Sequence, residues 1–317
     1  MRKKEQALER VIQAVFLLLG LVTVGCVLLI TIYLILSGIP AIRQIGLTDF
    51  LLGDTWASTA APPQFGILPF LLTSVYGTAG AVLFGVPVGF FTAVCLAKLA
   101  PPRLKMIAEG VVSLLAGIPS VVYGLVGMLV MVPAVRTAFH VPDGASLLSA
   151  IVVLAVMILP SIIKVSVTAL EAVPREYEDA SLALGATPVE TWFRVSVPAA
   201  RSGIAAAVVL GVGRAIGEAM AVMMVSGNAP NMPTLFGSVR FLTTAVASEM
   251  AYSQQGSLHQ QALFSIALVL FLFILLINAS LNFFLKQDRQ SSPRKRKKTS
   301  EEPQRSVPQP RKGGLPC

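Results

Sequence analysis

Long apolar runs separated by short polar segments dominate the chain. A helix that crosses a membrane needs roughly 20 mainly apolar residues. The runs of that length lie at 11–36, 67–97, 107–132, 147–165, 203–225 and 262–285. Transmembrane β-strands need only about 9–11 residues of alternating polarity. The pattern therefore predicts an all-α integral membrane protein with six transmembrane helices.

Glycine and proline residues interrupt the apolar pattern inside several of these spans. Pro87 follows Gly85 in the second span, and Gly117 and Pro119 lie together in the third. Membrane helices tolerate such residues where neighbouring groups or water satisfy the freed backbone. Two interpretations stay open: kinks that help the helices to pack, or hinges along a path, as in transporters with broken helices.

Composition and charge place the spans in a membrane and orient them. The chain is 55% hydrophobic and only 13% charged, which excludes a soluble globular domain. Lys and Arg gather before the first span, in the second and fourth connections, and after the last span. The positive-inside rule then predicts that both termini are cytoplasmic. The net charge of +9 follows from this topology and a basic tail at 286–317, which we expect to be disordered and to contact anionic lipid rather than nucleic acid.

A polar segment at 174–200 separates the fourth and fifth spans and carries the signals of two short helices. Pro174 suits the first position of one helix, and Gly185 suits the left-handed residue that ends it. Thr187, Pro188 and Glu190 then form a capping box that starts the second helix. We expect a folded cytoplasmic surface on which another protein acts.

The fifth span contains two charged residues, Arg214 and Glu218. A charge inside the membrane costs at least about 2.5–3.5 kcal/mol and needs a reason. On a continuous helix the two side chains share a face and can form an ion pair, while Gly213 and Gly217 allow another helix to approach closely. The pair either fixes packing or gating, or Arg214 meets an anionic solute in the transport pathway, with Glu218 setting its position or release.

Several chemical signatures are absent from the sequence. There is no phosphate-binding P-loop, no H-E-x-x-H zinc motif and no G-x-S-x-G nucleophile elbow. Three cysteines offer no disulfide framework or metal site, and we expect the two histidines, His140 and His259, to be solvated in outward loops. We therefore predict no catalytic residues, no metal and no cofactor.

The polar segment resembles the cytoplasmic EAA loop of ABC-importer permeases, whose pattern is E-A-A, three residues, Gly, nine residues and I-x-L-P. The matching positions here are Asp179, Ala180, Ser181, Gly185, Val195, Val197 and Pro198. Asp replaces the first Glu, Ser the second Ala, and Val both Ile and Leu. The resemblance implies a coupling loop in which Asp179, Ala180, Gly185, Val195 and Pro198 contact a separate ATPase.

Further strings at 65–74, 117–124, 213–222, 226–228 and 240–243 are similar to the PstC family of phosphate-importer permeases. The resemblance covers roughly 65–285. It implies a type I importer permease fold in a bacterial plasma membrane, a PstA-like sister permease, two PstB-like ATPase subunits and a PstS-like extracytoplasmic phosphate-binding protein. Pro87, Gly117, Pro119, Gly213 and Gly217 become its hinge or packing positions.

We therefore expect three regions: 1–65, a first span with an outward loop; 66–285, the permease core with the coupling loop at 174–200; and the tail at 286–317. The alternatives are a sulfate or molybdate permease, the sister permease PstA, an ion-coupled carrier or channel without an ATPase, a scaffold and, least supported, a membrane enzyme.

Overall fold

The computed structural model describes residues 2–290, and it is helical apart from one small hairpin. The helices are α1 (Arg2–Ile45), α2 (Leu47–Leu52), α3 (Leu68–Val94), α4 (Pro102–Gly117), α5 (Ser120–Val126), α6 (Val132–Phe139), α7 (Leu147–Glu171), α8 (Arg175–Ala183), α9 (Pro188–Thr191), α10 (Val197–Gly217), α11 (Met220–Val225), α12 (Leu242–Glu249) and α13 (Leu258–Gln290). The strands β1 (Trp56–Ala57) and β2 (Gln64–Phe65) pair antiparallel. Short π-helical segments η1 (Cys95–Leu99), η2 (Gly127–Met131) and η3 (Trp192–Ser196) continue α3, α5 and α9, and the 3-10 turn η4 (Met250–Tyr252) follows α12.

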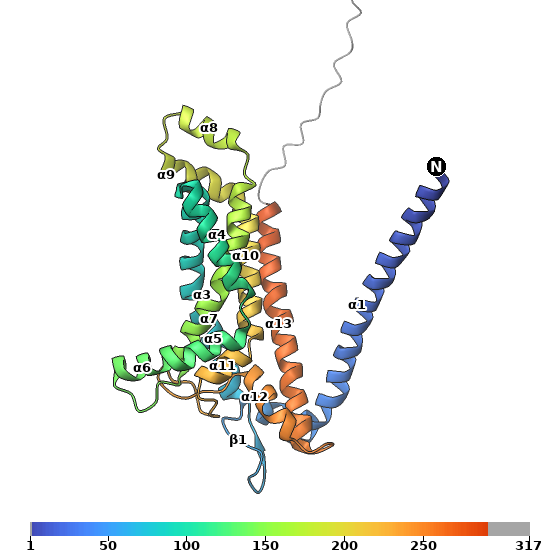
Figure 1. Cartoon of the computed structure of the whole chain (residues 1–317). Coiled ribbons are helices and arrows are strands. Elements are labelled where there is room, and N and C mark those ends of the chain that lie inside the picture. Colours follow the sequence, from blue (N-terminus) through green and yellow to red (C-terminus); the bar gives the residue numbers. More distant parts are fainter. Residues whose placement is uncertain (1, 291–317) are drawn as a thin grey trace, which may run out of the picture.

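Six helical segments of the described chain are long and apolar enough to cross a membrane. They are Glu9–Ile45, Leu68–Leu99, Ser120–Phe139, Leu147–Glu171, Pro188–Gly217 and Leu258–Ser280. The number of spans predicted from the apolar runs is thus confirmed. The N-terminal end of α1, the end of α13 and the α8–α9 loop lie at the same end of the molecule (Figure 1), as the predicted topology requires.

Helix α7 forms the centre of the bundle, between α3 and α10 (Figure 1). Glycines of α3 let the two helices approach closely: a Cβ built at Gly80, Gly85 or Gly89 would lie within 3 Å of an isoleucine side chain of α7. The isoleucines are Ile151, Ile158 and Ile162, and the last two are fully buried. Lipid tails are as apolar as these side chains, so the hydrophobic effect does not drive the helices together. Close packing at small residues stabilises the contact instead.

Helix α1 diverges from the rest of the bundle (Figure 1). It contacts α13 near its own C-terminal end, where Ser265 donates to the carbonyl oxygen of Gly38 at 2.6 Å and Tyr33 meets Phe264 edge to face. Its apolar side chains from Val11 to Ile32 are exposed, as suits a helix surrounded by lipid. The first helix runs nine residues beyond the predicted end at 36, to Ile45, and the short helix α2 follows it.

Of the two predicted interruptions, the one in the second span does not end the helix and the one in the third span does. Helix α3 continues through Pro87, so the helix does not end at 85–87. The role of Pro87 as a hinge or packing residue stays a prediction. The third span does break, because α4 ends at Gly117 and α5 begins after Pro119, and α5 and α6 leave the direction of α4 (Figure 1). Pro119 has no N–H to give the carbonyl of Leu115, and the hydroxyl of Tyr123 donates to that oxygen at 2.7 Å instead.

The ends of two further predicted segments differ from the structure. The fifth span, expected to run to 225, stops at Gly217 and is followed by the separate helix α11. Helix α13 continues to Gln290, so residues 286–290 are helical rather than disordered. The remainder of the predicted tail, 291–317, lies outside the described residues.

Candidate functional site

The loop between α7 and α10 is ordered by its own sequence. Gly185 ends α8 with a positive φ of 87°, a conformation that residues with a Cβ rarely adopt. Thr187 and Glu190 form the predicted capping box: Thr187 Oγ1 accepts from the Glu190 N–H at 3.3 Å, and Glu190 Oε2 accepts from the Thr187 N–H at 3.1 Å. Hydrogen bonds from the backbone and hydroxyl of Thr187, with the nearby charge of Arg194, lower the pKa of Glu190. Pro174 lies one position before α8 rather than in its first position.

The predicted coupling residues occupy different parts of this loop. Asp179 and Ala180 are exposed on α8, and Gly185 is exposed just after it. Pro198 is exposed in the first turn of α10, whereas Val195 is half-buried in η3.

Exposed apolar side chains on this polar loop were missed in the sequence. Leu184 is 90% exposed, and the other large apolar side chains exposed here are Tyr177, Leu182, Val189 and Phe193. The available signal was the position of Leu184 immediately before the glycine that ends α8. Apolar groups that gather on an exposed loop mark a protein-contact surface.

A partly buried carboxylate joins this loop to the bundle. Glu178 of α8 forms an ion pair with Lys98 of η1 and accepts a hydrogen bond from Ser196 Oγ of η3 at 2.8 Å. Burial acts to raise the pKa of Glu178, but the bonds from Lys98 and Ser196 outweigh it, and the pKa lies below its ordinary value. The sequence does not reveal this contact, because Lys98 lies 80 residues from Glu178.

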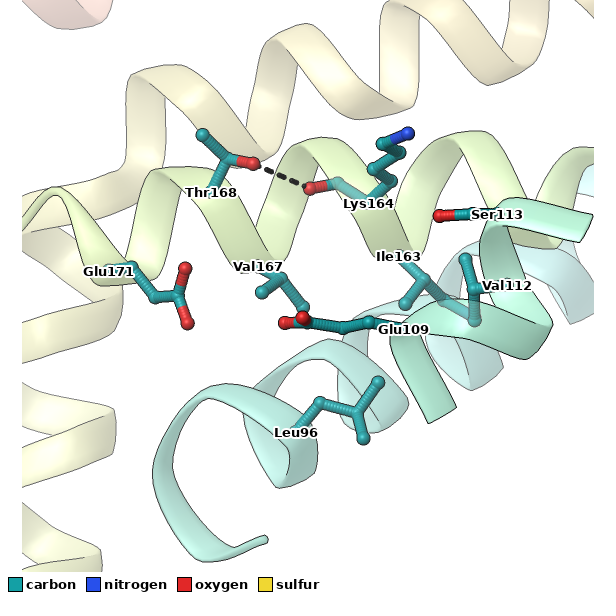
Figure 2. Close-up of a pocket in the computed structure, with 9 residues that line it drawn as sticks. All are labelled: Leu96, Glu109, Val112, Ser113, Ile163, Lys164, Val167, Thr168 and Glu171. Carbon is teal, nitrogen blue, oxygen red and sulfur yellow. Dashed lines mark hydrogen bonds between the residues drawn. The ribbon is translucent and has the colours of Figure 1, made fainter. Parts of the chain in front are cut away.

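A second charged group lies nearby, around a cavity of about 230 Å³ between α4 and α7. Figure 2 shows the carboxylates of Glu109 and Glu171 directed toward one another, with the amine of Lys164 pointing away. Lys105 forms ion pairs with both carboxylates, and its hydrogen bond to Glu171 is the main cause of its raised pKa. No cluster of potential metal ligands occurs among residues 2–290, in which such groups were sought.

Arg214 lies in the last turn of α10 and reaches toward α7, where its Nη1 donates to Ser161 Oγ at 3.2 Å. It borders a cavity of about 500 Å³. The cavity is lined by Ser161, Val209, Leu210, Gly213, Arg214 and Asn278, contributed by α7, α10 and α13. None of the ion pairs formed within the described chain includes Arg214.

The expected ion pair between Arg214 and Glu218 is therefore not formed. Glu218 is extended, with φ −75° and ψ 128°, because α10 ends at Gly217, so the four-residue helical spacing no longer applies. The Glu218 carboxylate instead accepts from the N–H of Ala221 at 2.9 Å, at the start of α11. Its backbone carbonyl accepts from Thr243 Oγ1 at 2.7 Å, which holds the break in place.

The glycines at the two helix breaks face open space: Gly117 at the end of α4, and Gly213 and Gly217 at the end of α10. Nothing in the described chain lies within 4 Å of a Cβ built at Gly213, Gly217 or Gly117. The close helix approach expected at Gly213 and Gly217 is thus absent within this chain. Gly211, two residues earlier, makes such a contact with Ile162 instead.

A charged cluster at the opposite end of the molecule from α8 was also missed. Glu249 accepts from Trp56 Nε1 at 3.0 Å, contacts His259 Nε2 at 2.8 Å and forms an ion pair with Arg240. Arg240 also donates to the carbonyl oxygen of Asn228 at 2.8 and 2.9 Å. His259, expected to be solvated, is half-buried in this cluster, so that expectation is wrong.

Comparison with known proteins matches residues 85–287 to the family model described as "Binding-protein-dependent transport system inner membrane component". The chain is 39% identical over 265 residues to "Probable ABC transporter permease protein YqgH" of Bacillus subtilis (strain 168), covering 81% of this chain and 86% of the relative. It is 33% identical over 257 residues to "Phosphate transport system permease protein PstC" of Mesorhizobium japonicum, covering 75% and 78% of the two chains.

The fold is similar to that of a chain in the inward-facing MetNI methionine ABC transporter, with a TM-score of 0.54. The sequences are 20% identical, and the match covers 70% of this chain and 97% of the other. This likeness supports the importer-permease fold.

Proposed function

This chain belongs to the family of binding-protein-dependent transport system inner membrane components, and from that premise we propose that it is the permease subunit of an ATP-driven importer of inorganic phosphate. It is a multi-pass protein of a bacterial inner membrane. Relatives named PstC in several organisms support phosphate as the solute. A PstA-like sister permease completes the pathway, and a PstS-like protein delivers the ion.

The environment of Arg214 is the observation that favours an anion as the transported solute. Its guanidinium borders a cavity without a carboxylate partner and with neutral polar groups, Ser161 and Asn278, beside it. A guanidinium binds oxyanions through a fork of N–H donors. A single such group binds an anion weakly enough to release it again, which a transport pathway requires.

The neutral neighbours of Arg214 suit phosphate better than sulfate. The hydroxyl oxygen of Ser161 and the amide oxygen of Asn278 can each accept a hydrogen bond. Phosphate retains at least one proton near neutral pH and can donate to them, whereas sulfate only accepts. A site that hydrogen-bonds a substrate hydroxyl discriminates against an analogue lacking it.

Coupling to ATP hydrolysis is assigned to the loop from α8 to the start of α10. Two PstB-like ATPase subunits, on separate chains, close when they bind ATP and move this loop through Asp179, Ala180, Gly185, Val195 and Pro198. The breaks after Gly117 and Gly217 are the places at which the spans change direction. The permease itself performs no chemistry.

The test is ATP-dependent uptake of radiolabelled phosphate by proteoliposomes that contain this chain and its partners, with sulfate as competitor. We expect uptake that sulfate does not suppress, and its loss in Arg214→Gln with the complex still assembled. Arg136→Gln is the matched control, because Arg136 is exposed near the end of α6.

Three results would contradict the proposal. Uptake of sulfate or molybdate in place of phosphate would make the chain a related oxyanion permease. Phosphate uptake without ATP would indicate an ion-coupled carrier or channel. Full uptake in Arg214→Gln would mean that Arg214 only contributes to packing. The variant Glu218→Gln tests in the same way whether Glu218 has a role in transport beyond its hydrogen bond at the start of α11.

A further inference from the structure

Helix α8 is attached to the membrane bundle by very little. It has no buried residue, and its close contacts are with α9 and η3 of the same loop. Ser181 of α8 bonds Thr191 of α9 at 2.9 Å, which again stays within the loop. Apart from the backbone at 172–174 that joins α8 to α7, a displacement of α8 therefore reaches the bundle through a small number of side chains.

Glu178 is the side chain of α8 that makes this connection. Its carboxylate contacts Lys98 of η1 and Ser196 of η3, which lead directly into α3 and α10. The three segments come from distant parts of the sequence, since Lys98 and Glu178 are 80 residues apart. Within the loop this carboxylate holds Ser196, the residue just before α10, and outside the loop it holds Lys98, which continues α3. It thus connects α8 to the ends of two helices that pack against α7.

This ion pair is only partly buried, but it is more shielded from water than its exposed neighbour. The side chains of Lys98 and Glu178 are 11% and 20% exposed, whereas those of the nearby pair Lys105 and Glu171 are 32% and 40% exposed. Exposed pairs are screened by water and contribute little, while breaking a buried pair leaves an unpaired charge. The Lys98–Glu178 pair can therefore hold its geometry while α8 is pushed.

We propose that the Lys98–Glu178 ion pair, braced by Ser196, is the joint through which displacement of α8 moves α3. The proposal rests on the proposed function of this chain as an importer permease. Glu178 and Lys98 are positioning residues: neither touches the solute, and Glu178 lies beside the predicted contact residue Asp179. An ATPase pushing α8 would move α3 only while this pair holds.

The first experiment measures phosphate uptake and ATP hydrolysis in the same proteoliposomes. For Lys98→Gln and Glu178→Gln we expect the ratio of phosphate imported to ATP hydrolysed to fall about tenfold, within the range of typical coupling energies. The exchanged pair Lys98→Glu with Glu178→Lys should recover most of the ratio, because it restores opposite charges. Lys105→Gln, which removes the exposed pair, is the matched control and should keep the wild-type ratio.

If both single variants keep the wild-type ratio of phosphate imported to ATP hydrolysed, the ion pair does not transmit the movement and the proposal is wrong. A parallel loss of uptake and ATP hydrolysis would also overturn it, since that result means loss of ATPase docking. Failure of the exchanged pair to recover the ratio, with the complex intact, would show that attraction between the two charges is not what matters.

A second measurement does not depend on the solute and so separates this proposal from the proposed function. The native cysteines are first replaced by serine. Spin labels at Glu176→Cys of α8 and Leu83→Cys of α3, which are both exposed positions, then report the distance between the two helices. In the otherwise wild-type complex, trapping ATP hydrolysis should leave this distance unchanged, because α8 and α3 move together. In Lys98→Gln the distance should change on trapping. A change in the wild-type background would overturn the joint even if the transported solute were not phosphate.

Discussion

The indole N–H of Trp56 donates to Oε2 of Glu249 at 3.0 Å and so joins two residues 193 positions apart. The same carboxylate contacts His259 and Arg240, and the guanidinium of Arg240 lies 5.7 Å from the centre of the Phe70 ring. The hairpin, α3, α12 and the start of α13 are thereby tied together at one end of the bundle.

Replacing Glu249 with Gln should destabilise this end of the protein. The amide still accepts from Trp56 but cannot neutralise Arg240, which is mostly buried, so we expect a loss of about 1–3 kcal/mol in unfolding free energy. Denaturant unfolding of the detergent-solubilised permease measures it. Asp143→Asn, an exposed change, is the control, and an unfolding midpoint equal to that of the wild type would contradict the prediction.

The attachment of α8 should depend on pH in a defined direction. The pKa of Glu178 is below its ordinary value of 4.5, so the ion pair with Lys98 stabilises the folded loop fully above that value. The contribution is lost as the pH falls through the lowered pKa. The mobility of a spin label at Glu176→Cys should therefore rise with a midpoint below 4.5.

Lys98→Gln provides the control for that titration. It removes the main interaction that lowers the pKa of Glu178, while burial still raises it. The midpoint of the mobility change should move to higher pH. A midpoint that is the same with and without Lys98 would contradict the assignment of the transition to this pair.

Gly185→Val should impair coupling through backbone strain. No atom lies within 4 Å of a Cβ built at Gly185, so the substituent has room, but its φ of 87° costs an ordinary residue about 1–2 kcal/mol. We expect lower phosphate uptake per ATP hydrolysed in proteoliposomes. Gly185→Asn is the matched control, since Asn tolerates this conformation, and equal loss in both variants would point to the side chain rather than the backbone.

Leu184→Ser should weaken binding of the ATPase subunit. Leu184 is 90% exposed, so its loss should not destabilise the permease, whereas a buried leucine at an interface contributes about 1.5–3 kcal/mol. Co-purification of the ATPase with the tagged permease measures the effect. Tyr252→Ser is the matched control, because Tyr252 is 89% exposed in η4, directly after α12, and α12 lies at the opposite end of the molecule from α8 (Figure 1). Retention of the ATPase by Leu184→Ser would place the contact elsewhere.

Local signals predicted the parts of this protein that local physics determines. Apolar length gave the number of spans, and the capping box at Thr187 and the end of α8 at Gly185 appear as expected. The two loop features depend on residues within about one helical turn, where spacing fixes geometry, and each span depends on one continuous apolar run.

Tertiary contacts decided what the sequence did not predict. The break at Glu218 contains no proline and is held by Thr243, 25 residues away. Helix α3 passes through Pro87 while Gly85 and Gly89 pack closely on α7. Glu178 meets Lys98 from 80 positions away and Glu249 meets Trp56 from 193 positions away, and a lone carboxylate in a sequence does not reveal such partners.

The capping box at Thr187 and the glycine turn before it have a consequence for the kinetics of assembly. A loop that needed its partner in order to fold would lose conformational entropy at every encounter and bind more weakly for its contact area. Here the bonds between Thr187 and Glu190 and the turn at Gly185 are already made within the permease alone. Under the proposed function, an ATPase subunit would therefore meet a finished surface, and it would engage and release that surface in each cycle without any refolding step.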